Sequence, residues 1–114
     1  MVLDAGHGGK DPGAVGSKRQ NREKDINLSI VLEVGRLLSA HNKDIEIIYT
    51  RETDKFIELG QRARIANKAK ANLFISVHTN AVPKNARKAN TCLTKLHFGV
   101  IMTMLLRCRK ERKL

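Results

Sequence analysis

Two histidines and one glutamate are the side chains of this sequence that combine most readily into a catalytic metal site. His7 lies in a glycine-rich segment, Glu23 in a charged one, and His78 at the end of an apolar run. Zinc in hydrolases is usually held by three side chains from His, Asp or Glu, with water in the fourth position. Taken singly, each signal is weak: a lone histidine in a loop is more often a surface or hydrogen-bonded residue than a ligand, and Glu23 alone would be interpreted as a solvated or helix-capping charge. His41 and His97 lack such a context.

The apolar pattern of the chain predicts the elements that position these three residues. Segments rich in strand-forming residues lie at 1–5, 45–50 and 72–78,. Apolar residues with helical spacing run over 26–41 and again from about 54 to 69,. The order is strand, glycine-rich loop, helix, strand, helix, strand.

Short polar side chains before each helical pattern are candidate N-caps. Asp25 or Asn27 is expected to cap the first helix, and Thr53 or Asp54 the second. The side chains of the second helix that are expected to face inward are Ile57, Ala63, Ile65 and Ala66.

This alternation of strands and helices predicts an α/β fold with three layers, in which helices flank a largely parallel twisted sheet. Ligand sites in such sheets lie beyond the carboxyl ends of the strands. His7 follows the first predicted strand and His78 ends the third. Both imidazoles are therefore expected at the edge of the sheet where a site belongs.

Five segments of the chain also resemble those of a known hydrolase family. In chain order they are Val2-Leu3-Asp4-Ala5-Gly6-His7-Gly8-Gly9, Glu23-Lys24-Asp25, Thr50-Arg51-Glu52-Thr53-Asp54, Leu59-Gly60-Gln61-Arg62-Ala63 with Ala66-Asn67, and Phe74-Ile75-Ser76-Val77-His78-Thr79-Asn80. In order and approximate spacing they resemble the zinc-dependent N-acetylmuramoyl-L-alanine amidases (amidase type 3 family), which act in bacterial cell separation and spore-wall lysis. The resemblance covers roughly residues 1–90.

The resemblance implies that His7, Glu23 and His78 are ligands of Zn²⁺. Two neutral imidazoles and one carboxylate would leave the ion a net charge of about +1, so it would still polarise an amide carbonyl and acidify bound water. The implied reaction is hydrolysis of the amide bond between the lactyl group of N-acetylmuramic acid and the L-alanine of the peptidoglycan stem peptide. Peptidoglycan or muropeptides are then the partners, and the implied location is extracytoplasmic, in the periplasm or cell wall.

Several other residues in the matched segments are candidates for supporting the ligands or the substrate. Gly8 and Gly9 would let the backbone approach the metal or the substrate closely. Asp4 is a candidate for orienting a ligand imidazole. The side chains expected to brace loops and helix ends are Arg51, Arg62, Asn67 and Asn80. Of these, Arg51 and Asn80 are retained as supporting candidates for the site.

The general base of the family is not found in this chain. In the family it is a glutamate on a strand near the C-terminal end of the domain, followed by an apolar-Gly-Phe stretch ending in Asn. Glu111 is the only acidic residue after Glu58, and its basic neighbours would depress its pKa and weaken it as a base. Loss of general acid–base catalysis lowers a rate by about 10²–10⁴-fold, so impaired turnover is expected.

The C-terminal segment differs in composition from the rest of the chain. Residues 1–81 carry 13 basic and 10 acidic side chains, whereas 82–114 carry nine basic and one acidic, so most of the net charge of +11 lies there. We therefore expect a partial amidase catalytic domain at 1–90 and an atypical basic and apolar tail at 91–114, with the sheet truncated or altered on its C-terminal side.

A frameshift after about Asn90 is one hypothesis for this tail. Ile101-Met102-Thr103-Met104, read one base out of frame, can encode Asp-His-Asp-Asn, which resembles what the family carries downstream of its third zinc motif. Sequencing the coding DNA tests the hypothesis, because some frame must then restore a strand with the missing glutamate.

Two alternative functions follow from other features. A non-catalytic fragment that binds zinc or peptidoglycan would keep His7, Glu23 and His78 without turnover, and muropeptide hydrolysis assays distinguish it from an enzyme. Nucleic-acid binding is suggested only by the net charge. No helix-turn-helix pattern or aromatic stacking platform supports it, so we expect no nucleic-acid partner.

Neither the targeting signals nor the cysteines of the sequence indicate a further function. The opening Met1-Val2-Leu3-Asp4 predicts a strand rather than a signal peptide, and the apolar stretch from Phe98 to Leu106 is too short to span a membrane,. Cys92 and Cys108 lack the CxxC spacing of a zinc site, so they are interpreted as incidental thiols,.

Overall fold

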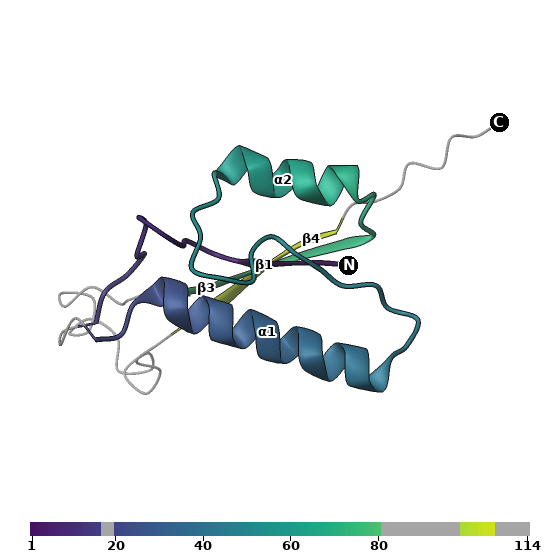
Figure 1. Ribbon diagram of the computed structural model, residues 1–114, viewed down its shortest axis with the longest axis horizontal. Helices are drawn as coiled ribbons and strands as arrows, with labels where there is room; N and C mark the ends of the chain where they lie inside the picture. The colour runs from purple at the N-terminus through teal and green to yellow at the C-terminus, as the bar shows by residue number, and fades with distance from the viewer. Residues whose placement is uncertain (17–19, 81–98, 107–114) are drawn as a thin grey trace.

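The computed structural model describes residues 1–16, 20–80 and, as backbone, 99–106. In chain order, the elements are β1 (Val2–Ala5), α1 (Glu23–His41), β2 (Ile48–Tyr49), α2 (Leu59–Lys68), β3 (Leu73–Asn80) and β4 (Gly99–Leu106). Figure 1 shows α1 and α2 on opposite faces of the sheet. The predicted three-layer α/β fold is confirmed.

The strands form one sheet in the order β2-β1-β3-β4. β1 lies between β2 and β3 and pairs with both in parallel, with Leu3 opposite Tyr49 and Ile75. β4 is antiparallel to β3 and pairs along its whole length, from Leu73 opposite Leu106 to Asn80 opposite Gly99. The three strands predicted from the sequence are therefore parallel, and the fourth extends the sheet beyond them.

The face of the sheet that meets α1 is apolar. Because side chains alternate along a strand, Leu3 and Ala5 of β1 point to the same face as Val77 of β3. All three are buried with Val31 of α1 in one cluster. Burying a side chain of this kind stabilises the fold by about 1.5–3 kcal/mol. The helical spacing of apolar residues in α1 is thus explained by this contact.

The opposite face, toward α2, holds a buried polar cluster beside the apolar side chain of Val2,. Asp4 of β1 accepts hydrogen bonds from Thr50 Oγ1 at 2.6 Å and Ser76 Oγ at 2.6 Å. Arg62 of α2 donates to the same carboxylate at 2.8 Å, and both members of this ion pair are buried. Arg62 is the buried residue of α2, whereas Ala63 is exposed and Ile65 and Ala66 are half-buried. The predicted inward face of this helix is therefore wrong for Ala63, and the predicted burial of Ile57 is confirmed in the loop before the helix.

Both predicted helix starts are also wrong. Helix α1 begins at Glu23, three residues before the expected start, and its cap residue Arg22 makes no side-chain cap hydrogen bond. Preceding loop carbonyls accept instead: Glu23 N–H donates to Ala14 O at 2.8 Å and Lys24 N–H to Pro12 O at 3.2 Å. The first helical N–H groups thus have partners without a capping side chain.

Helix α2 begins at Leu59, and Glu58 stands at the cap position without a side-chain hydrogen bond. Asp54 does not cap a helix because its carboxylate binds elsewhere: Gly9 N–H donates to Oδ1 at 2.7 Å, and Lys24 Nζ donates to Oδ2. Strand β2 is two residues long rather than six. Strand β3 continues to Asn80, so His78 lies within the strand.

The tail expected at residues 91–114 contains β4, which pairs with the edge of β3. Cys92, Cys108 and Glu111 lie outside the described residues. Within the part of the chain that the structure describes, neither helix is both long and apolar enough to cross a membrane.

Candidate metal centre

Three elements bring one side chain each to the carboxyl edge of the sheet. His7 follows β1, Glu23 begins α1, and His78 lies near the end of β3. His7 Nε2 is 3.1 Å from Glu23 Oε1, and His78 Nδ1 is 3.2 Å from the same oxygen. The two ring nitrogens are 3.2 Å apart. The three candidate metal ligands of the sequence are therefore assembled in one small triangle.

The Glu23 carboxylate is fixed by its surroundings. Its side chain is only 2% exposed. Ala14 N–H donates to Oε2 at 2.8 Å, and Thr79 N–H donates to Oε1 at 3.1 Å. Burial opposes ionisation, but the Ala14 N–H, the charge of His7 and the hydrogen bonds from Asn27 and His78 together lower the pKa of Glu23 below its usual value. The first turn of a helix also favours a negative charge.

His7 has an unusual backbone conformation and is held by two hydrogen bonds. Its backbone adopts φ 62°, in the left-handed region that residues other than glycine rarely occupy,. Its ring Nδ1 lies 2.8 Å from Asp11 Oδ2, and its carbonyl accepts a hydrogen bond from Arg62 Nη2 at 2.8 Å. The hydrogen bond with His7 is the main reason that the pKa of Asp11 is lowered. Backbone strain that is held by several contacts is typical of functional sites.

Two glycines make room for the ligand side chains. A Cβ on Gly6 would lie 2.3 Å from the His78 ring, so the absence of a side chain lets that ring lie across the end of β1. Gly13 has φ 65°, and a Cβ there would lie 2.7 Å from both Glu23 Oε2 and His7 Cδ2. Any larger residue at either position would displace a ligand.

Gly8 and Gly9 have close contacts within the chain itself. A Cβ on Gly8 would meet Lys55 O at 2.2 Å, and one on Gly9 would meet Phe56 N at 2.6 Å. These glycines let the loop that carries His7 pack against the 51–58 loop, and their close contacts are with that loop rather than with the ligand triangle.

The donor atoms fit a tetrahedral zinc ion. Ligand atoms at about 2.0–2.1 Å from zinc lie about 3.3 Å from one another in a tetrahedron, and a fourth position is left open by three protein ligands. The observed separations of 3.1–3.2 Å are close to this spacing. His7 Nε2, His78 Nδ1 and Glu23 Oε1 lie close to one another, so a cation among them could be bound by all three,.

Asp4 does not contact either imidazole. Its carboxylate is bound by Thr50, Ser76 and Arg62 on the α2 face, so the prediction that it orients a ligand is wrong. Asp11 occupies that position instead.

Two arginines donate hydrogen bonds to backbone carbonyls around the site. Arg51 donates to the carbonyls of Ala5, Gly6, Lys24 and Thr53. Burial, followed by the charge of nearby Arg62, lowers the pKa of Arg51. Arg62 donates to the carbonyls of Ala5, His7 and Ile57. Asn80 is exposed at the end of β3, and Asn67 is exposed on α2.

Sequence reasoning missed three residues that touch the ligands: Asp11, Asn27 and Thr79. Asn27 lies one helical turn after Glu23 and donates to Gly6 O at 3.2 Å, while it accepts a hydrogen bond from Thr79 Oγ1. Its position four residues after a ligand, on the same face of a helix, is a signal that was available. Asp11, four residues after His7 in a loop, carried no such periodic signal.

Comparison with known proteins agrees with this geometry. The family model Amidase_3, described as N-acetylmuramoyl-L-alanine amidase, matches residues 1–104. The match therefore extends past residue 90 and includes most of β4. An endolysin of Bacillus phage SPP1 is 52% identical over 81 residues, which cover 71% of this chain and 29% of that protein.

Longer alignments and solved structures give the same assignment. The N-acetylmuramoyl-L-alanine amidase AmiA of Escherichia coli K12 is 37% identical over 114 residues, covering 98% of this chain and 38% of that protein. The catalytic domain of the amidase CwlV from Bacillus (Paenibacillus) polymyxa superposes with a TM-score of 0.70 at 47% identity, over 75% of this chain and 47% of that domain. The chain thus spans less than half the length of each of these relatives. It belongs to the N-acetylmuramoyl-L-alanine amidase family.

Proposed function

We propose that this chain provides the zinc-binding part of an amidase site that hydrolyses the bond between N-acetylmuramic acid and L-alanine in peptidoglycan. The observation that carries the proposal is the convergence of His7, Glu23 and His78 from three separate elements. Family membership supports the same reaction. Because peptidoglycan lies outside the cytoplasmic membrane, the proposed place of action is extracytoplasmic.

His7 Nε2, His78 Nδ1 and a carboxylate oxygen of Glu23 would hold the zinc ion. When bound, zinc supplies Lewis-acid chemistry, in which an amide carbonyl is polarised and water becomes more acidic. Glu23 is suited to this role because two backbone N–H groups orient its carboxylate, and its pKa is lowered despite burial, with the hydrogen bond from Ala14 N–H as the largest favourable cause. A histidine binds a metal ion through a deprotonated ring nitrogen, so zinc binding to this site is expected to weaken as the pH falls.

The protein groups around the ligands would keep the site rigid. Arg62 holds the carbonyl of His7, and Arg51 holds the carbonyls of Ala5 and Gly6, so the loop after β1 cannot relax when substrate approaches. Rigid ligands lower the reorganisation that accompanies the reaction. These arginines are buried behind the loop, and we assign them no contact with substrate.

General acid–base catalysis is the part that we propose is impaired. Among the described residues, the carboxylates in contact with the site histidines are Glu23 and Asp11, and each is already committed to a hydrogen-bonding role. Without a separate general base, turnover would be slower by about 10²–10⁴-fold than in a complete enzyme.

Hydrolysis of purified muropeptides tests the proposed function. We expect slow release of the stem peptide that stops when a chelator removes zinc and is absent in His78→Ala. Hydrolysis that continues with undiminished rate in the chelator would contradict the zinc-dependent reaction. Retention of muropeptide with no turnover at all would favour a binding fragment over an enzyme.

A further inference from the structure

We propose that Asp11 is a positioning residue for the zinc site, which holds a proton on Nδ1 of His7 and so leaves Nε2 free to bind the metal. The inference rests on the proposed function, because it concerns how one ligand of that site is prepared. Asp11 does not face the ligand triangle itself; it acts on His7 from the far side of the ring.

The hydrogen bond between the two side chains is short and direct. Asp11 Oδ2 lies 2.8 Å from His7 Nδ1. An ionised carboxylate only accepts hydrogen bonds, so the proton between these atoms must belong to the ring nitrogen. In a neutral imidazole the other nitrogen, Nε2, then carries the lone pair. That nitrogen is the one that lies 3.1 Å from Glu23 Oε1 and 3.2 Å from His78 Nδ1.

The loop is built to keep Asp11 in place. Gly13 N–H donates to Asp11 Oδ1 at 3.1 Å, so each carboxylate oxygen has its own donor. The backbone of Asp11 also forms a reciprocal pair with Gly8, with N–H to O distances of 2.9 and 3.1 Å. The carboxylate is therefore fixed by main-chain contacts that do not depend on the histidine.

His7 needs this support more than His78 does. His78 lies in the regular strand β3, where it pairs with Ile101 of β4. His7 lies in a loop at φ 62°, where the backbone alone does not determine where the ring points. A carboxylate behind a metal-binding imidazole fixes both its tautomer and its orientation, and removal of such a partner typically weakens metal binding by about 10–100-fold.

The tautomer of His7 in the metal-free protein is the first test. Long-range ¹H–¹⁵N spectra, recorded at a pH where the ring is neutral, distinguish a protonated from an unprotonated ring nitrogen. We expect a protonated Nδ1 in the wild-type chain. A protonated Nε2 would overturn the inference, and this result needs no variant and no metal.

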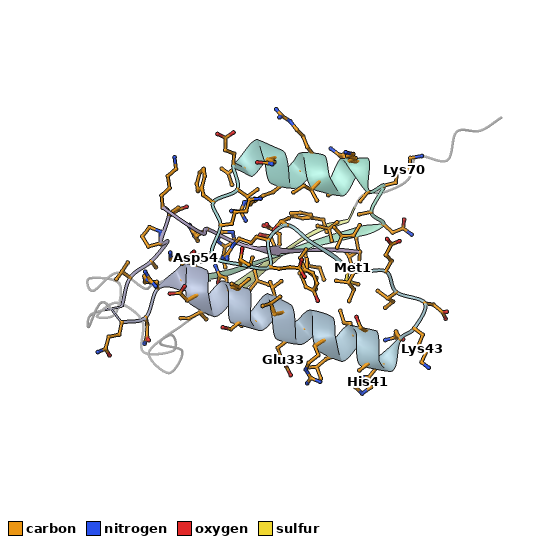
Figure 2. All side chains as sticks on the ribbon, in the orientation of Figure 1. Met1, Glu33, His41, Lys43, Asp54 and Lys70 are labelled. Atoms are coloured by element: carbon orange, nitrogen blue, oxygen red, sulfur yellow. The ribbon has the colours of Figure 1, made fainter. Side chains whose placement is uncertain are left out.

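Zinc affinity is the second test, measured by competition with a chromophoric chelator. Asp11→Ala is expected to bind zinc about 10–100-fold more weakly than wild type and to lose the preference for a protonated Nδ1. Asp11→Glu keeps a carboxylate and should recover part of both properties. Asp44→Ala is the matched control, because it removes the same charge from the exposed turn after α1 and should leave both unchanged. Asp54 marks the site end of the molecule, because its carboxylate binds Gly9 in the loop that carries His7. Lys43, the residue before Asp44, lies far from it (Figure 2).

The outcomes separate this inference from the proposed function. Wild-type affinity in a folded Asp11→Ala variant would overturn the role of Asp11 while the zinc site itself stands. If the wild-type chain binds no zinc, the proposed function fails, and the tautomer in the metal-free protein still decides whether Asp11 holds the Nδ1 proton.

Discussion

Helix α1 packs on the sheet through apolar side chains, whereas on the α2 side a buried ion pair and its hydrogen bonds lie beside apolar Val2. On the α1 side, Leu3, Ala5, Val31 and Val77 form a buried cluster. On the α2 side, Asp4 and Arg62 form a buried ion pair. Apolar packing needs only shape and area, but a buried charge must have its partners in place. The two faces should therefore respond differently to single substitutions.

The helices on both faces contribute to the site at the carboxyl edge of the sheet, but one contributes a ligand and the other a supporting contact. Helix α1 supplies a ligand directly, since Glu23 stands in its first turn. Helix α2 supplies support, since Arg62 donates to the carbonyl of His7. The polar cluster is therefore coupled to the site through hydrogen bonds, while the apolar face mainly stabilises the fold.

Arg62→Met should have the largest effect. It leaves the Asp4 carboxylate buried without its cationic partner, which typically costs about 3–5 kcal/mol, and it removes three hydrogen bonds to backbone carbonyls. Urea denaturation measures the loss in the free energy of unfolding. The double variant Asp4→Asn with Arg62→Met should lose less than the single one, because the unpaired charge is gone. A single-variant loss of only about 0.5 kcal/mol, typical of a surface site, would contradict this view of the polar cluster.

Leu3→Ala tests the apolar face. Leu3 is fully buried against α1, and truncation of a buried leucine to alanine costs about 2–5 kcal/mol. We expect the folded fraction of this variant to bind zinc with wild-type affinity, in contrast to Arg62→Met, which should bind more weakly because His7 loses a contact. Equal losses of zinc affinity in the two variants would remove the proposed difference between the faces.

Asp54→Asn should have the smallest effect, and one that depends on pH. Asp54 accepts hydrogen bonds from Lys24 and Gly9, and these hold its pKa below the ordinary value of 3.8. Figure 2 shows Asp54 beside the start of α1. A carboxylate whose pKa is lowered by folding stabilises the protein above its unfolded pKa, and the stabilisation is lost as the pH falls through the folded value.

The difference in unfolding free energy between wild type and Asp54→Asn should therefore be constant near neutral pH and disappear in acid below 3.8. Urea titrations at a series of pH values measure it, with Asp44→Asn as the control for removing an exposed carboxylate. A difference that grows as the pH falls would have the wrong sign.

Much of the fold could be predicted because its information is local. The spacing of Val31 with its apolar neighbours predicts α1, and the apolar run before His78 predicts β3. The resemblance supplied the ligand set, and the strand order placed both histidines at one edge. The predictions that failed concern side chains whose hydrogen-bond partners are distant in the sequence. Asp54 has the local features of an N-cap, but its carboxylate is bound by Gly9, 45 residues away in sequence.

The polar cluster could not be predicted for the same reason. Asp4 in an apolar strand gives no sign of its partners, since Arg62 is 58 residues away and Ser76 is 72 residues away. Nor does the sequence show that Asp11 rather than Asp4 contacts His7, because a loop has no periodicity from which side-chain direction can be inferred. The origin of the segment after residue 90 stays a prediction for the coding DNA to test.

The most direct test of the account is the amount of zinc bound per chain in the purified protein, determined by elemental analysis for the wild type and for His78→Ala. We predict near-stoichiometric zinc in the wild type and its loss in the variant, with circular dichroism showing that both are folded. A folded wild-type chain that neither retains nor takes up zinc would contradict the account, as would a His78→Ala variant that binds zinc as fully as the wild type.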